Sequence, residues 1–250
     1  MNTFLIIITI IYGIIIGSFL NVCIYRIPKN ESIVTDRSHC MTCGHKLKWY
    51  DLVPLVSYLT LGGKCRYCKT KISKQYPIIE FTNGVLYGIL VVVNGFNIST
   101  ILFCLCSSAL LALSVIDWRT FEIPIAFNIF IGILGIIRLL TDLEYWYVYI
   151  IGFFAVSGFL YLLFLITKGR GIGGGDIKLM ATAGLLIGWK NIILALGIGC
   201  VLGSIIHIIL MKVQNKERVL AFGPYLSLGI YIAMLYGNQI IEWYINTFIY

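Results

Sequence analysis

Long apolar runs alternate with short polar stretches along the whole chain. Eight of these runs have roughly the length needed to span a bilayer, some of them only with their flanks. They cover 4–20, 78–93, 101–116, 123–140, 148–166, 177–189, 192–211 and 224–245. The second and sixth are short, so they need little tilt or some flanking residues to cross. The pattern predicts an all-α polytopic membrane protein with about eight transmembrane helices.

The composition agrees with this pattern, since 59% of the 250 residues are hydrophobic and 12% are charged. The mean hydropathy is +0.92, and a soluble domain cannot bury that much apolar surface. The first run has no basic segment before it and no small-residue cleavage site after it. We therefore interpret it as a retained transmembrane helix rather than a cleaved signal peptide.

One long polar stretch interrupts the apolar runs. It divides the chain into a first transmembrane helix (1–20), a polar domain (21–77) and a membrane domain (78–250). If the polar domain is cytoplasmic, 17 of the 19 lysines and arginines face the cytoplasm, ten of them in that domain. The positive-inside rule favours this orientation. The inner basic residues beyond the domain are Arg119, Lys168, Arg170, Lys178, Lys212, Lys216 and Arg218, and the outer ones are Arg138 and Lys190.

Two Cys-x-x-Cys pairs, separated by 21 residues, lie in the polar domain. Their members are Cys40, Cys43, Cys65 and Cys68. Paired knuckles at about this spacing are typical of tetrahedral zinc, and a reducing cytosol keeps the thiols out of disulfides. Four sulfur ligands leave no position for water, which indicates a structural zinc and not a zinc protease. His39 and His45 flank the first pair and are alternative ligands.

Lysines and arginines surround the two cysteine pairs. The simplest interpretation is a solvated surface near anionic headgroups of membrane lipid. We expect no nucleic-acid partner, because the domain is tethered against a membrane at both ends.

Two aspartates occupy matching places in the membrane domain. Asp117 ends the third apolar run, and Asp176 opens the sixth directly after the glycine-rich residues 171–175. Both fall at the cytoplasmic end of a helix, where ionisable groups usually serve function. Two facing carboxyl groups cannot both ionise cheaply, which is the basis of aspartic-protease chemistry. The alternative is structural: Asp117 pairs with Arg119 or Lys178, and Asp176 caps a helix.

Asp117 with Ile123-Pro124, and residues 173–179 around Asp176, resemble the two active-site motifs of the type IV prepilin leader peptidases. These enzymes belong to the Gly-x-Gly-Asp class of intramembrane aspartyl proteases. The resemblance continues through residues 17–22, 25–28, 49–54, 63–68, 76–80 and 222–224, so it covers nearly the whole chain in order. The asparagine that usually follows the Ile-Pro pair is displaced to Asn128, and the resemblance gives that residue no role.

The resemblance implies an intramembrane aspartic endopeptidase. The implied catalytic pair is Asp117 and Asp176, and the implied cleft residues are Gly173, Gly174, Gly175 and Lys178. The implied substrate is the precursor of a type IV pilin or pseudopilin, from which a short basic leader is removed in pilus assembly or protein secretion. The implied location is the bacterial cytoplasmic (inner) membrane, with the active site and the zinc domain on the cytoplasmic side.

Many members of that family also methylate the new N-terminus with S-adenosyl-L-methionine. This second activity rests on the resemblance alone, because no glycine-rich turn follows a strand pattern as in a Rossmann-type methyltransferase. Glu80 is our candidate for orienting or deprotonating the amine, and the alternative is a charge favoured by the helix dipole. Asp51 and Asn21 are weaker candidates. The sequence indicates neither the particular pilin, nor the donor site, nor the oligomeric state.

Two other functions fit parts of the pattern. A carboxylate-relay transporter would need acidic groups near the bilayer midplane beside broken helices, whereas Asp117 and Asp176 lie at helix ends. A non-enzymatic, zinc-bearing membrane adaptor would leave the glycine-rich residues 171–175 without a use.

Overall fold

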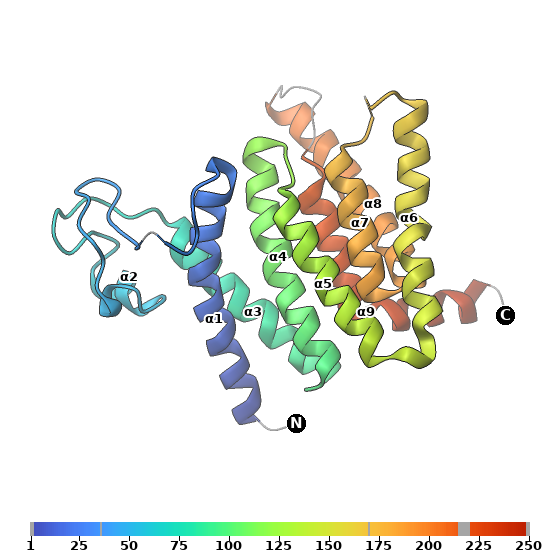
Figure 1. The fold of residues 1–250 in the computed structure, drawn as a ribbon, viewed down its shortest axis with the longest axis horizontal. Coiled ribbons are helices and arrows are strands. Elements are labelled where there is room, and N and C mark those ends of the chain that lie inside the picture. Colours follow the sequence, from blue (N-terminus) through green and yellow to red (C-terminus); the bar gives the residue numbers. More distant parts are fainter. Residues whose placement is uncertain (1–2, 36, 170, 215–220, 249–250) are drawn as a thin grey trace. The chain divides into compact units, whose positions relative to one another are not determined.

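The computed structural model describes residues 3–35, 37–169, 171–214 and 221–248. Within these ranges the chain is helical, with isolated bridges in place of strands (Figure 1). The α-helices are α1 (Thr3–Arg26), α2 (Val56–Thr60), α3 (Gln75–Asn94), α4 (Ile98–Thr120), α5 (Ile125–Thr141), α6 (Trp146–Ile166), α7 (Gly174–Ile187), α8 (Trp189–Gln214) and α9 (Gly223–Phe248). Short 3₁₀ turns are η1 (Ile27–Lys29), η2 (Trp49–Asp51) and η3 (Leu143–Tyr145). The chain divides into two units, residues 1–100 and 101–250.

In the first unit, α1 and α3 pack closely because glycines lie at their crossing. A Cβ at Gly17 would lie 2.7 Å from the Cα of Glu80, and one at Gly13 would lie 2.9 Å from the Cα of Gly84. The Nδ2 of Asn83 also donates to the carbonyl of Gly13 at 2.7 Å. Small residues that let two backbones approach, reinforced by an interhelical hydrogen bond, are typical of helix pairs in membranes.

Both helices extend further than the apolar runs predict. The first run was expected to end at residue 20, but α1 continues to Arg26 because its polar residues find partners. Nδ2 of Asn21 donates to the carbonyl of Tyr76 at 3.2 Å, and Arg26 donates to the carbonyl of Ser32 at 3.0 Å. At the other side, α3 begins at Gln75 rather than at residue 78. The second predicted helix thus borrows the flanking residues that its length required.

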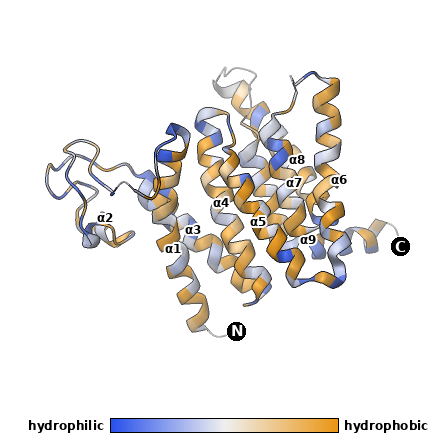
Figure 2. Ribbon diagram, in the orientation of Figure 1, coloured by the Kyte–Doolittle hydropathy of each residue, from blue (hydrophilic) through white to orange (hydrophobic). Residues whose placement is uncertain are grey.

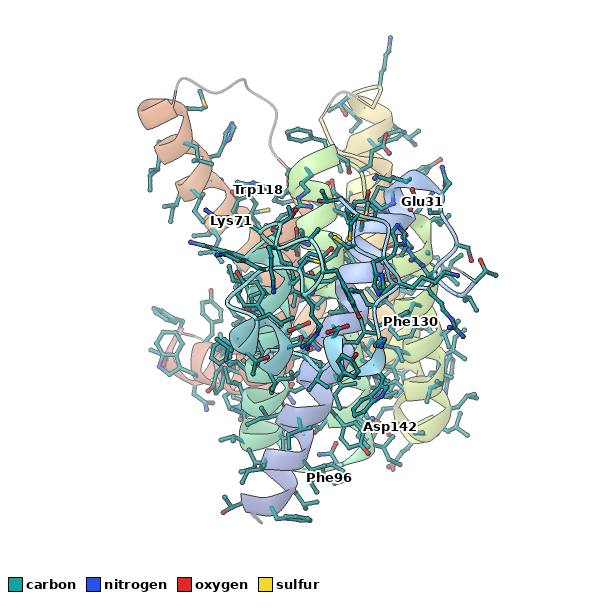
Figure 3. All side chains as sticks on the ribbon, turned by 90° about the vertical axis from the view of Figure 1, so that its left-hand side faces the viewer. Glu31, Lys71, Phe96, Trp118, Phe130 and Asp142 are labelled. Carbon is teal, nitrogen blue, oxygen red and sulfur yellow. The ribbon has the colours of Figure 1, made fainter. Side chains whose placement is uncertain are left out.

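The second unit is a helical bundle with α7 at its centre, since α7 packs against α5, α6, α8 and α9. Every residue of α7 from Leu179 to Ile187 except Thr182 is buried. Its helices are mostly apolar along their whole length (Figure 2). Trp118 lies towards one end of this unit and Asp142 towards the other, with Phe130 between them (Figure 3). Asp117, beside Trp118, therefore belongs to the end opposite Asp142.

Within the described residues, five helical segments are long and apolar enough to cross a membrane by length and composition, so the chain is an integral membrane protein. They are Thr3–Lys29, Gln75–Asn94, Ile98–Thr120, Leu143–Ile166 and Trp189–Met211. The sixth predicted run forms the 14-residue α7, which at 1.5 Å per residue is about 21 Å long, less than the ~30 Å of a hydrocarbon core. The total of eight crossings stays a prediction. Of the predicted inner basic residues, Arg170, Lys216 and Arg218 lie outside the described residues.

Candidate active site

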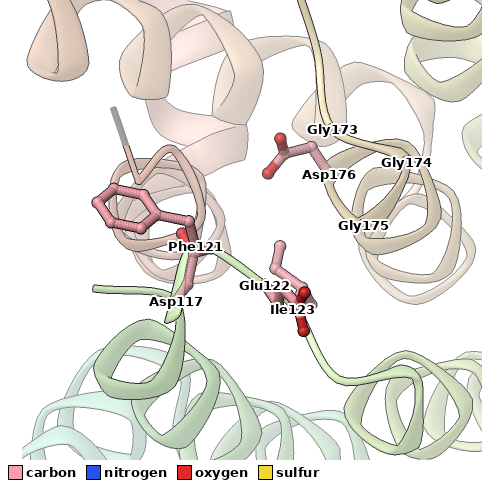
Figure 4. Close-up of a pocket in the computed structure, with 8 residues that line it drawn as sticks. All are labelled: Asp117, Phe121, Glu122, Ile123, Gly173, Gly174, Gly175 and Asp176. Atoms are coloured by element: carbon pink, nitrogen blue, oxygen red, sulfur yellow. The ribbon is translucent and has the colours of Figure 1, made fainter. Parts of the chain in front are cut away.

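Asp117 and Asp176 line one cavity of about 300 Å³ in the second unit. In Figure 4 the carboxyl group of Asp176 points into this space. The linker between α4 and α5 (residues 121–124) lies across from the glycines at 173–175. The eight lining residues are Asp117, Phe121, Glu122, Ile123, Gly173, Gly174, Gly175 and Asp176. The two aspartates are 59 positions apart in the sequence, and packing of α7 within the bundle brings them to the same space.

Asp117 lies in the last turn of α4 and is buried. The helix ends three residues later, where Phe121 takes the left-handed conformation (φ 56°) and donates its N–H to the carbonyl of Asp117 at 2.9 Å. The carboxylate of Asp117 accepts a buried hydrogen bond from the N–H of Gly223, with an Oδ2 to N distance of 2.9 Å. Gly223 is the first residue of α9, so a helix N-terminus faces this carboxylate.

A side chain at position 223 would collide with this arrangement. A Cβ on Gly223 would lie 2.7 Å from Oδ2 of Asp117 and 3.3 Å from Cδ1 of Ile123. The absence of a side chain is therefore what lets the backbone of α9 approach Asp117 closely enough to donate its N–H.

Asp176 is the third residue of α7, and the N–H of the N-cap residue Gly173 hydrogen-bonds its carboxylate. This is the helix-start half of a capping box, in which a carboxylate in the first turn satisfies a free backbone donor. Gly175 faces the α4–α5 linker: a Cβ there would lie 2.9 Å from the Cβ of Ile123. The bare backbone at Gly175 thus lets the linker, and with it Asp117, lie close to Asp176.

This arrangement can perform acid–base chemistry. Two carboxyl groups that line one cavity disfavour double ionisation, so one of them tends to hold a proton while the other is charged. The eight lining residues include no serine, cysteine, histidine or lysine that could serve as a nucleophile. The chemistry available in this cavity is activation of a water by one carboxylate and proton donation by the other.

The predicted residues divide between the cavity and its surroundings. Gly173, Gly174 and Gly175 line it with both aspartates. Lys178, predicted to border the cleft, lies exposed one turn further along α7 and is not among the lining residues. Asn128 is buried in α5, and both of its side-chain polar atoms are without a hydrogen-bond partner.

Sequence reasoning missed two features of this cavity. Glu122, beside the Ile-Pro pair, adds a third carboxylate to the lining, and its charge next to a motif was the available signal. Gly223 lies in the 222–224 motif, but no pattern in the sequence indicates that its N–H reaches a residue 106 positions earlier.

The four cysteines of the polar stretch come together in the first unit, with all four Sγ atoms within 4.8 Å of one another. The Sγ atoms of Cys40 and Cys68 are 3.7 Å apart. A tetrahedral zinc with Zn–S bonds of about 2.3 Å places its sulfurs about 3.8 Å apart, so the geometry fits a four-thiolate site. None of these cysteines is in a disulfide.

Two matching turns position these thiols. The N–H of Cys40 bonds to the carbonyl of His45 at 2.9 Å, and the N–H of Cys65 bonds to the carbonyl of Thr70 at 2.8 Å. Four residues after each of these cysteines the backbone is left-handed, at Gly44 (φ 68°) and at Lys69 (φ 60°). Hydrogen bonds with the Thr70 hydroxyl and backbone lower the pKa of Cys68 to about 6. The lowered pKa of Cys68 favours the thiolate, which is the form that binds metal.

Glu80 lies in α3 of the first unit and is buried. Its Oε2 accepts the N–H of Leu55 at 2.8 Å, and Ser18 gives it a second hydrogen bond. The weaker candidates are also engaged: Asp51 forms an ion pair with Arg66 at 2.7 Å, and Asn21 accepts from Gln75 at 3.2 Å. All three polar residues thus have structural partners within the first unit.

Comparison with known proteins connects both units to one family. Residues 11–94 match the model of the bacterial peptidase A24 N-terminal domain, and residues 104–208 match that of the type IV leader peptidase family. The chain is 32% identical to a Pseudomonas aeruginosa protein named prepilin leader peptidase/N-methyltransferase, over 95% of this chain and 92% of the relative. A Bacillus subtilis protein of the same name is 34% identical, over 94% and 96% respectively. No solved structure matches.

Proposed function

The chain belongs to the type IV leader peptidase family, and from this premise we propose that it is an intramembrane aspartic peptidase that removes the leader of prepilins and methylates the new N-terminus. The observation that carries the proposal is the cavity shared by Asp117 and Asp176. The direct test is to incubate the purified protein with a candidate prepilin and S-adenosyl-L-methionine and to weigh the product. Its mass reports leader removal and methylation together.

In the proposed mechanism, one aspartate takes a proton from a water as that water attacks the scissile carbonyl. The other aspartate donates its proton to the carbonyl oxygen, and the pair then passes a proton to the leaving amine. Gly173, Gly174 and Gly175 carry no side chains to obstruct an extended substrate, so its backbone can approach the catalytic pair. We propose that the cavity faces the cytoplasm, as the distribution of basic residues favours.

The two alternative functions, a carboxylate-relay transporter and a non-enzymatic adaptor, agree less well with the described residues. A carboxylate relay needs acidic groups along a path through the bilayer, whereas Asp117 and Asp176 are both near helix ends. A purely structural adaptor would need neither a cavity with several carboxylates nor a buried N–H aimed at one of them.

Gly223 offers a test of the proposed mechanism. We expect Gly223→Ala to lower kcat for leader removal by about 10- to 100-fold with little change in KM, because a displacement of a catalytic group by about 1 Å costs that much. The added Cβ would lie 2.7 Å from Oδ2 of Asp117 and would force this carboxylate away. The measurement is steady-state cleavage of a purified prepilin.

Gly203→Ala is the matched control, since its added Cβ would lie 3.4 Å from the ring of Phe222, an ordinary contact. Equal kcat for Gly223→Ala and the unaltered protein would contradict a role of the Gly223 N–H in positioning Asp117.

We propose that the four cysteines bind one structural zinc ion. The thiolates of Cys40, Cys43, Cys65 and Cys68 would hold it, and it would fix the turns that carry them. A polar segment of this size with few buried apolar side chains needs such a cross-link to stay folded.

For the methyl donor we propose S-adenosyl-L-methionine, from the names of the relatives. The carboxylate of Glu80 is buried and its Oε2 accepts the N–H of Leu55, but a carboxylate keeps further acceptor positions for an amine. Glu80 therefore stays a candidate for orienting the amine of the cleaved substrate.

Glu80→Gln is expected to leave cleavage intact and to lower methylation by roughly 10-fold or more, as loss of a general base does. Glutamine keeps an oxygen that can accept the N–H of Leu55, so the change removes the charge and spares the contact. Mass spectrometry of the processed product measures both activities. Glu80→Ala is the comparison that removes the acceptor as well; if only this variant loses methylation, Glu80 acts through Leu55 and not as a base.

A further inference from the structure

The segment between the two cysteine pairs carries large apolar side chains that the described residues of the first unit leave exposed. Its exposed side chains recur at intervals of three and four positions. They are Trp49, Leu52, Val56 and Leu59, with exposed fractions of 79%, 43%, 56% and 75%. The segment is a 3₁₀ turn and a short helix joined at Leu55, and large apolar side chains left exposed this close together favour burial against another phase or partner. We call residues 49–59 with these four side chains the apolar segment.

A hydrogen bond fixes the apolar segment beside the membrane helices. The N–H of Leu55 donates to Glu80, which lies five residues after the start of α3, about 7–8 Å along its axis. Glu80 packs on Gly17 of α1, nine residues and about 13 Å before the end of that helix. Both α1 and α3 meet the criteria for membrane spans. In Figure 1, α2 accordingly lies alongside α1 and not beyond its C-terminal end.

One backbone donor of the apolar segment, the N–H of Leu55, is satisfied without water. Leu55 adopts a left-handed conformation (φ 59°), and its N–H is satisfied by a buried carboxylate from another helix rather than by solvent. Backbone donors that sink into a bilayer need such internal partners, because lipid offers none.

Positive charge flanks the exposed tryptophan. The ring of Trp49 is 5.7 Å from that of Tyr50, and Lys48 and Arg66 lie over the Tyr50 ring at 5.8 and 5.1 Å. Across residues 27–74 there are nine lysines and arginines against three acidic residues. Tryptophan next to cations is the combination found at the headgroup level of membranes with anionic lipid.

We propose that the apolar segment inserts into the headgroup–acyl boundary of the bilayer, with Trp49, Val56 and Leu59 among the acyl chains and Lys48 at anionic phosphates. The cysteine domain is then a membrane-lying element anchored in lipid between α1 and α3. This inference does not depend on the peptidase activity.

Fluorescence quenching in proteoliposomes tests the proposal with the full chain. The fluorescence of Trp49 is obtained by subtracting the emission of the Trp49→Phe variant from that of the unaltered protein. The subtraction removes the emission of the other four tryptophans. In vesicles of phosphatidylglycerol and phosphatidylcholine with brominated acyl chains, we expect this difference signal to be quenched by about twofold or more. Acrylamide in the aqueous phase should quench it weakly, and omission of phosphatidylglycerol should weaken the lipid quenching.

Leu59→Asp should reduce the lipid quenching of Trp49, because it places a charge in the inserted face. Val34→Asp is the matched control: Val34 is 85% exposed in the same polar stretch but lies outside the apolar segment. Equal metal content in both variants verifies that the cysteine turns stay folded.

Three outcomes would overturn the proposal. Quenching by acrylamide without quenching by brominated lipid would place Trp49 in water. Protection from both quenchers would mean that protein, another part of this chain or a second copy, covers the segment. Lipid quenching that Leu59→Asp leaves unchanged would show that this face does not anchor the domain.

Discussion

Asp117→Asn and Asp176→Asn are each expected to slow leader removal by roughly 10²- to 10⁴-fold, the range lost when a positioned acid or base is removed. Asparagine keeps the size of the side chain, and at position 117 its oxygen can still accept the N–H of Gly223. The amide of asparagine cannot act as an acid or a base as the carboxyl group of aspartate does. The measurement is single-turnover cleavage of a purified prepilin, followed by the mass of the product.

The double variant should be hardly slower than either single one, because residues that act as a unit lose their effect together. Asp142→Asn is the control carboxylate: Asp142 lies at the opposite end of the same unit (Figure 3), bound to Tyr149 at 2.6 Å and Arg138 at 3.4 Å. Full processing by either single catalytic variant would remove that aspartate from the mechanism.

Loss of a cysteine ligand should have the largest effect on stability. Structural zinc in small domains contributes apparent binding free energies of ~10–16 kcal/mol at neutral pH, so Cys65→Ser should lose the metal and unfold the cysteine turns. We expect metal analysis to find about one zinc per chain in the unaltered protein and much less in the variant. Limited proteolysis should then cut the variant within the polar stretch at protease concentrations that spare the unaltered protein.

Cys200→Ser is the control, because Cys200 is exposed on α8 in the second unit. It should keep both the metal and the protease resistance. A purified, reduced and active protein that contains no metal would refute the structural zinc.

The spacing of residues along the chain predicted those features that depend on contacts between residues close together in the sequence. The two cysteines of each Cys-x-x-Cys pair lie within one turn, so their proximity follows from the sequence. The approach of one turn to the other depends on the fold, and the structure brings the four thiols together. The two aspartates were placed by the same reasoning, since each ends or begins an apolar run. Their position in one cavity follows from the packing of α7.

Helix length and membrane crossing were harder to predict, because a helix can be apolar either to lie in lipid or to lie inside the protein. Residues 179–187 of α7 are apolar because they lie inside the protein bundle, and Gly188 (φ 82°) ends the helix early. Conversely, polar Asn21 and Arg26 indicated the end of the first span, yet α1 continues through them because they find hydrogen-bond partners. Hydropathy alone does not distinguish burial in protein from burial in lipid.

The contact between Asp117 and Gly223 has a consequence for the newly made protein. The helix that supplies the donor, α9, is synthesised after both aspartates, since it begins 47 positions beyond Asp176. A nascent chain that stops before residue 223 carries both acidic groups but cannot orient the first of them. We therefore expect a chain truncated before α9 to cleave its substrate more slowly than the whole chain, because it lacks the N–H that orients Asp117.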